Sequence, residues 1–90
     1  MKGSTELFKQ IISIINNEEL IEWKDCHNKV INLLQSKGYN CELITEEITN
    51  HYFNSCEITY FKFADFCYNY LEKPEKIIHH IGFEYLKKFD

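Results

Sequence analysis

The sequence predicts an all-α fold, a compact bundle of four to five short helices around a central aromatic helix, in one domain over residues 1–90. Apolar residues recur at helical spacing in several segments, and helix-capping residues stand between those segments. Six of the thirteen Phe and Tyr residues fall within one stretch, EITYFKFADFCYNYLE at residues 57–72. An apolar fraction of 44% and an aromatic fraction of 16% are typical of a folded chain, because disordered chains contain few aromatic residues.

The first two predicted helices form an antiparallel hairpin, because the turn between them is short. Ser4 is a favourable N-cap for the first helix, which is expected to reach about residue 16. An asparagine pair at residues 16–17 caps the second helix, with glutamates at residues 18–19 in its first turn and Gly38 after its end. The two apolar faces are formed by Phe8, Ile11, Ile12 and Ile15, and by Leu20, Trp23, His27, Val30, Ile31 and Leu34.

The third helix and the final helix are marked by the residues that start them. Thr45 is an N-cap with the apolar Ile44 before it, and Asn-Ser at residues 54–55 ends the third helix. Pro74 opens the final helix, since proline fits the first helical position. Gly82 inside that helix costs about 1 kcal/mol relative to alanine, which favours a close crossing there with the aromatic helix. The final apolar stripe is Ile78, Ile81, Tyr85 and Phe89.

The aromatic stretch is interpreted as a helix with Thr59 as its N-cap. At about 100° per residue, most of its apolar side chains share one broad arc, which is typical of a core helix packed on several sides. Phe61 and Tyr68 fall together beyond the edge of that arc. The alternative is an α+β fold in which residues 39–43 and 57–63 pair as a small two-stranded ribbon, because the second segment is rich in β-branched and aromatic residues.

No motif in the chain indicates catalysis or a bound cofactor. Four cysteines and four histidines are present, but neither CxxC nor HxxxH occurs. Cys26 beside His27 is the best pair for a catalytic thiol, yet it follows Glu22 and Asp25, whereas a reactive thiolate needs an electropositive setting. The sequence therefore predicts a protein that is not an enzyme and has no catalytic, cofactor-binding or metal-binding residues.

Charge and composition narrow the class of partner. The net charge is −4, and all ten basic residues are lysines scattered along the chain, without a single arginine. Nucleic-acid binding relies on a clustered basic surface, so direct binding to DNA or RNA is disfavoured. No apolar run reaches membrane-spanning length and no secretory signal precedes the cysteines, which favours reduced thiols and a cytoplasmic location.

Two groups of residues are candidates for binding a protein partner. Acidic residues at positions 18, 22 and 25 have the spacing i, i+4 and i+7 on the exposed side of the second helix, and two glutamates begin the third helix. They form either an ordinary solvated face or an acidic patch that steers the protein onto a basic surface. The aromatic edge of the central helix is either core or an anchor for a partner. The candidates are Glu18, Glu22, Asp25, Glu46, Glu47, Phe61, Asp65 and Tyr68.

These properties predict a small acidic, non-enzymatic inhibitor that binds a larger basic protein, including one that itself binds nucleic acid. Toxin-immunity proteins and phage inhibitors of host defence, such as anti-CRISPR proteins, have this size and acidity, but the likeness is one of class and involves no shared motif. One alternative is a helical DNA-binding regulatory domain with residues 45–55 as its recognition helix, although that segment has no lysine and begins with two glutamates. The other is a homodimerisation module that uses Phe61, Tyr68 and the last helix.

Overall fold

Helices make up the regular structure of the part of the chain that the computed structural model describes, residues 2–17, 19, 22–54, 58–75, 77–79 and 82. Four helices follow one another: α1 at Lys2–Ile15, α2 at Trp23–Ser36, α3 at Glu46–Phe53 and α4 at Tyr60–Tyr70. The backbone is helical again at Glu75, at residues 77–79 and at Gly82. The predicted all-α bundle of four to five short helices is confirmed.

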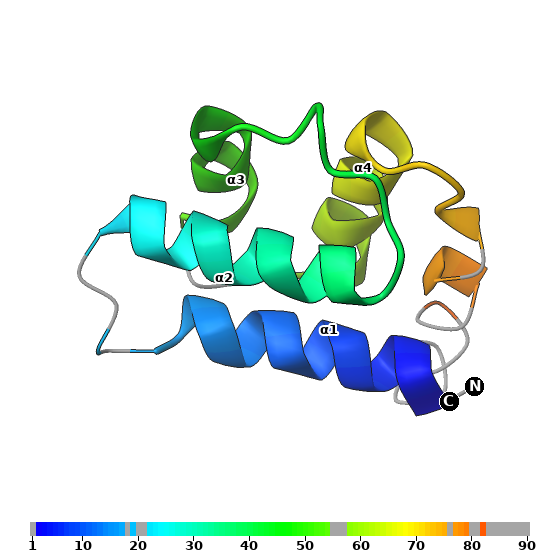
Figure 1. Cartoon of the computed structure of the whole chain (residues 1–90). Coiled ribbons are helices and arrows are strands. Elements are labelled where there is room, and N and C mark those ends of the chain that lie inside the picture. Colours follow the sequence, from blue (N-terminus) through cyan, green and yellow to red (C-terminus); the bar gives the residue numbers. More distant parts are fainter. Residues whose placement is uncertain are drawn as a thin grey trace.

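The helix pair α1 and α2 forms the long side of the bundle. The two helices lie side by side and run in opposite directions, as the predicted hairpin requires (Figure 1). Both α3 and α4 lie on one side of this pair, with their axes steeply inclined to it (Figure 1). Contacts join α2 to α1 and to α3, and α3 to α4. The molecule is therefore a hairpin with two shorter helices packed across it.

The core is centred on α4, which confirms the predicted central aromatic helix. Phe63, Phe66 and Cys67 are fully buried. The ring of Phe63 meets Phe8 of α1 with 5.3 Å between ring centroids, and the ring of Phe66 meets Phe53 of α3 at 5.0 Å. Edge-to-face and tilted contacts of this kind add to the free energy of burying the rings. One side of α4 thus joins helices from both halves of the chain.

The predicted N-caps of α3 and α4 are confirmed by hydrogen bonds. The Thr45 hydroxyl accepts from the backbone N–H of Ile48 at 3.3 Å, and the Thr59 hydroxyl accepts from that of Lys62 at 3.2 Å. Each bond satisfies a first-turn N–H that has no partner inside its helix. The two threonines therefore fix where these helices begin.

The end of α2 is also as predicted. Gly38 has φ of +90°, in the left-handed region that glycine adopts without a steric penalty. Its N–H donates to the carbonyl oxygen of Gln35 at 2.9 Å, and the N–H of Tyr39 donates to that of Leu34 at 3.2 Å. This pair of bonds is a Schellman motif, which satisfies carbonyl groups that the helix leaves open at its C-terminus.

The predicted start of α2 is wrong. The helix begins at Trp23, and Glu22 occupies its N-cap position without a side-chain hydrogen bond. The side-chain oxygen of Asn17 accepts from the N–H of Glu19 at 2.9 Å. Such an asparagine turn competes with helix formation, so it delays the helix that the asparagine pair was expected to start.

Two further expectations are corrected. The first helix begins at Lys2, so Ser4 lies within its first turn and is not its N-cap. The alternative ribbon is wrong for the described residues, since residues 39–43 form a loop with a turn at 42–43 and no strand, and Tyr60 to Phe63 are helical. The Thr59 cap and the burial of one side of α4 favour the helix over a strand.

The predicted crossing at Gly82 is confirmed. A Cβ atom at Gly82 would lie only 2.7 Å from the hydroxyl oxygen of Tyr60 in α4. The last helical segment starts where predicted, because the N–H of Ile78 donates to the carbonyl oxygen of Pro74 at 3.1 Å. The Tyr60 hydroxyl donates to the carbonyl oxygen of Ile78 at 3.4 Å. The other predicted stripe residues, Ile81, Tyr85 and Phe89, lie outside the described residues.

Three cysteines, Cys26, Cys41 and Cys67, are buried in the core. Burial raises the pKa of Cys41 and of Cys67 above the ordinary value, because a thiolate is poorly solvated in the core. These thiols therefore act as small apolar groups. Cys56 lies outside the described residues.

Candidate partner-binding surfaces

The outer side of α4 carries two large exposed aromatic residues. Phe61 is 70% exposed and Tyr68 is 60% exposed. They are seven residues apart, which places them about two turns apart on the same side of the helix. Asp65 is also exposed and lies between them at helical spacing from both. The structure thus brings together three predicted residues, Phe61, Asp65 and Tyr68, in a surface that we call the aromatic face.

Asp65 is held in place by a hydrogen-bonded group that joins α3 to α4. The Tyr52 hydroxyl of α3 donates to the Asp65 carboxylate at 2.5 Å, and the Asn69 side-chain amide donates to the same carboxylate at 3.2 Å. The hydrogen bond to Asp65 raises the pKa of Tyr52, and burial of the phenol adds to this shift. The aromatic face therefore has a fixed negative charge at its centre.

A second surface lies between the start of α2 and α3. An open cavity of about 580 Å³ is lined by Trp23 of α2 and by Thr45, Glu46, Glu47 and Asn50 at the start of α3. We call it the acidic cavity. It includes two of the predicted partner-binding residues, Glu46 and Glu47, together with an indole ring that the sequence pattern had assigned to the apolar stripe of α2.

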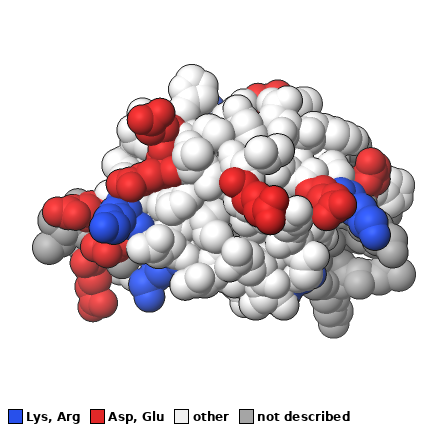
Figure 2. Space-filling view, turned by 45° about the horizontal axis from the view of Figure 1, so that its top comes forward, with Lys and Arg blue, Asp and Glu red and all other residues white. Residues whose placement is uncertain are grey.

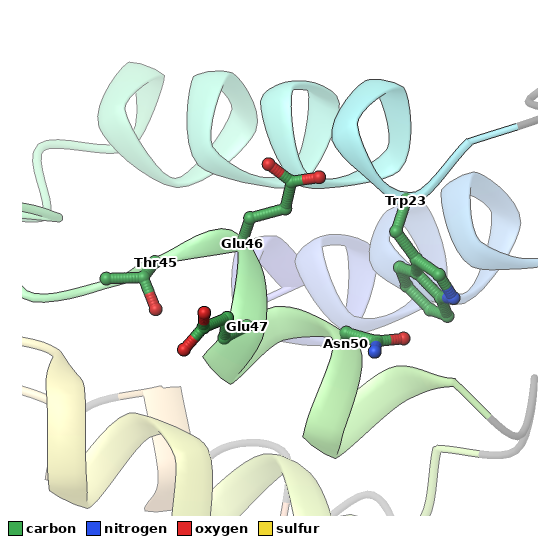
Figure 3. Close-up of a pocket in the computed structure, with 5 residues that line it drawn as sticks. All are labelled: Trp23, Thr45, Glu46, Glu47 and Asn50. Atoms are coloured by element: carbon green, nitrogen blue, oxygen red, sulfur yellow. The ribbon is translucent and has the colours of Figure 1, made fainter.

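The side chains that line the acidic cavity point in different directions, and those of Thr45 and Glu47 point away from Trp23 (Figure 3). The Trp23 ring projects from the first turn of α2 and lies beside Asn50, and Glu46 extends from α3 toward α2 (Figure 3). Glu46 and Asn50 are four residues apart, so they share one side of α3. Trp23 is only half-buried, which leaves part of its ring open to the cavity.

The expected acidic stripe along the second helix is not present as predicted. Only Asp25 lies within α2, in its first turn, while Glu22 precedes the helix as the N-cap and Glu18 lies outside the described residues. Figure 2 shows the acidic side chains of one face in several separate groups, with uncharged surface between them. Negative charge is therefore spread over the described surface, and Glu22 and Asp25 add to it on either side of Trp23 in the chain.

A hydrogen bond between α2 and α3 supports the acidic cavity. His27 Nδ1 and the Thr49 hydroxyl are 2.8 Å apart, and Thr49 is fully buried. The Thr49 hydroxyl donates to the carbonyl oxygen of Thr45 at 3.1 Å, so it accepts a hydrogen bond from the Nδ1–H of His27. This contact ties together the two helices that carry the walls of the cavity.

Sequence reasoning did not identify Trp23, Asn50 or Tyr52 as parts of these surfaces. The sequence pattern predicts Trp23 on the apolar face of the second helix, and the rings of Trp23 and Tyr52 do pack against the core. Both side chains also carry a polar group, and such residues are frequent where a core meets a surface. That amphipathic character is the signal that could have indicated their position.

The described residues contain no group of three or more His, Cys, Asp or Glu side chains arranged to bind a metal ion. Within the same residues, no helix has both the length and the apolar character needed to cross a lipid bilayer. The aromatic face and the acidic cavity are therefore the surfaces on which a functional argument depends.

Comparison with known proteins identifies no relative, since no family model, no curated protein and no solved structure matches the chain significantly. Fold likeness and shared motifs thus contribute nothing to a functional assignment. Function has to be inferred from the chemistry of the two surfaces.

Proposed function

We propose that this chain is a non-enzymatic protein-binding protein that inhibits a larger, basic protein by covering part of its surface. The observation that carries the proposal is the aromatic face, where Phe61 and Tyr68 are exposed by 70% and 60%. Large aromatic residues contribute much of the binding free energy at protein interfaces when they enter pockets of a partner. Two of them, about 10 Å apart along one helix, fit this use.

Charge supports a basic partner. The chain has a net charge of −4, and Asp65 is fixed at the centre of the aromatic face by Tyr52 and Asn69. Complementary charge accelerates association and excludes partners of the wrong sign. A nuclease or another nucleic-acid-binding protein has such a basic surface, which is the kind of target that toxin-immunity proteins and anti-CRISPR proteins neutralise. The free buried thiols of Cys41 and Cys67 favour a reducing compartment, and we propose a cytoplasmic location for the inhibitor.

The recognition-helix alternative is disfavoured by the charges of α3. This helix begins with Glu46 and Glu47, and its eight residues contain no lysine. The end of a recognition helix that enters the major groove approaches phosphate groups, which repel carboxylates. We therefore prefer a protein partner to a nucleic acid.

The test is capture of the partner by purified protein from extracts of its native host. The Phe61→Ser/Tyr68→Ser variant should lose the captured protein, with affinity reduced at least about tenfold, because both anchors are removed. Leu43→Ser is the matched control, since Leu43 is also 70% exposed but lies outside α4. The captured protein should be basic, and its activity on nucleic acid or another substrate should fall when the wild-type chain is added in equimolar amount.

Two results would oppose the proposal. Equal capture by wild type and by Phe61→Ser/Tyr68→Ser would exclude the aromatic face as the binding surface. A wild-type dimer in sedimentation experiments that becomes monomeric in the double variant would show that the aromatic face serves homodimerisation.

A further inference from the structure

Asp65 lies almost midway between the two exposed rings of the aromatic face. At about 1.5 Å per residue, Phe61 and Tyr68 are about 10 Å apart along α4, and Asp65 is within about 1 Å of their midpoint. Lys62 is the other charged residue of α4, but it follows Phe61 by one residue and is therefore turned about 100° around the helix from it. A molecule that covers both rings therefore also covers the Asp65 carboxylate.

The Asp65 carboxylate is oriented before a partner binds. Its Oδ2 atom accepts from the Tyr52 hydroxyl at 2.5 Å, and its Oδ1 atom accepts from the Asn69 side-chain amide at 3.2 Å. Each carboxylate oxygen can accept two hydrogen bonds, so each retains the capacity for one more. Asp65 is exposed, which leaves the carboxylate within reach of a donor from another molecule. A side chain that is already oriented loses less conformational entropy when it binds.

A second copy of the chain fits the aromatic face poorly. A twofold dimer can cover both rings in two ways, because either Phe61 meets Tyr68 across the dimer or each ring meets its own equivalent. In both arrangements the two Asp65 carboxylates lie next to each other, since Asp65 occupies the middle of the face. Like charges brought together in an interface oppose association. The position of Asp65 therefore favours a different protein that presents a positive charge.

We infer that the aromatic face receives an arginine side chain of the protein partner at Asp65, with apolar groups of the same partner over Phe61 and Tyr68, an inference that rests on the proposed function. The guanidinium group donates in a planar fork that matches the two oxygens of a carboxylate, and its flat faces stack on aromatic rings. A lysine ammonium lacks both the fork and the flat surface. The chain itself contains no arginine, so a second copy cannot supply this group.

The first test uses a variant of the protein as the probe. Asp65→Arg places an arginine between the same two exposed rings, so twofold pairing with the wild-type chain brings that arginine onto the wild-type Asp65. Fluorescently labelled wild type, titrated with Asp65→Arg and followed by anisotropy, should give a Kd at least about tenfold lower than with the neutral control Asp65→Gln. Circular dichroism checks that both variants are folded. Equal binding of Asp65→Arg and Asp65→Gln, no saturable binding of Asp65→Arg, or equal binding of Asp65→Lys would overturn the inference.

A conservative variant tests the same contact on the natural partner. In the capture experiment, Asp65→Asn should bind the captured protein at least about tenfold more weakly than wild type, because the amide keeps the shape of the side chain but lacks its charge. The matched control Glu6→Gln, with the same charge change at an exposed site in α1, should bind within about twofold of wild type. Equal binding by Asp65→Asn and wild type, or equal weakening by Glu6→Gln, would overturn the inference and leave the proposed function standing. Capture retained by Phe61→Ser/Tyr68→Ser would instead oppose the proposed function.

Discussion

The two sides of α4 carry the same residue types in opposite environments, one buried and one exposed. On the inner side Phe63 and Phe66 are fully buried, whereas on the outer side Phe61 is 70% exposed and Tyr68 is 60% exposed. All four lie within eight successive residues. The difference comes from helical phase, since side chains seven apart share a side and side chains two apart do not. Composition alone therefore predicts neither burial nor function in such a segment.

The inner and outer rings of α4 also differ in the property that their loss should change. The ring of Phe66 contacts the rings of Phe53, Tyr52 and Tyr70 with centroid distances of 5.0, 5.7 and 5.9 Å. Phe61 meets the neighbouring ring of Tyr60 at 5.4 Å but keeps most of its surface in solvent. Loss of the inner rings should cost folding free energy, and loss of the outer ones should cost partner affinity.

The largest expected effect tests this separation directly. Phe66→Ala should lower the free energy of unfolding by about 3–5 kcal/mol, because it leaves a cavity in the core, and Phe66→Leu should lower it less. Phe61→Ala, the matched change on the outer side, should stay within about 0.5 kcal/mol of wild type. Urea denaturation followed by circular dichroism measures both. Similar losses at residues 61 and 66 would show that the two sides are not distinct.

A smaller effect is expected where α4 meets the last helical segment. Gly82→Ala should destabilise the protein by about 1 kcal/mol, because overpacking against Tyr60 exceeds the gain in helix propensity. In a Tyr60→Phe background, which removes the hydroxyl oxygen 2.7 Å from the new Cβ position, Gly82→Ala should cost less. Thermal melts of wild type, Gly82→Ala, Tyr60→Phe and the double variant measure both differences. A stabilising Gly82→Ala would mean that Tyr60 moves away without cost.

The smallest effect concerns the charge at the centre of the aromatic face. Asp65→Asn should lower the pKa of Tyr52 toward its ordinary value of 10.0, because the bond to Asp65 is the main cause of the raised pKa. A raised folded-state pKa stabilises the fold below the unfolded value, and this contribution is lost as pH rises through the folded value. The variant should therefore lose less stability than wild type above about pH 10. Titration of ring-labelled tyrosine by NMR measures the shift, and an unchanged Tyr52 would contradict it.

The helix boundaries that could be predicted are those with a local cause. Thr45 and Thr59 bond to N–H groups three residues ahead, and Gly38 adopts the left-handed conformation at its own position. The close approach at Gly82 followed from the absence of a side chain. The start of α2 could not be predicted from capping preference. The Asn17 side chain can either cap a helix or accept from the N–H of Glu19 in a turn, and that turn competes with the helix.

The parts of the candidate surfaces that escaped prediction depend on contacts between helices. Tyr52 and Asp65 are 13 residues apart, and His27 and Thr49 are 22 apart. A periodic pattern gives the side of a helix on which a residue lies, but it does not give the partner helix that covers that side. The same limit applies to Trp23, whose place in the wall of the acidic cavity depends on where α3 packs.

The burial of Cys67 makes its thiol a probe of local opening of α4. Its thiol lies on the inner side of α4 with no exposed surface, and burial raises its pKa, so an alkylating reagent cannot attack it in the closed fold. Alkylation requires an excursion in which α4 leaves the core. The rate at which Cys67 is alkylated therefore reports how often α4 leaves the core. A partner bound to the opposite side of the same helix would lower that rate without contacting the thiol.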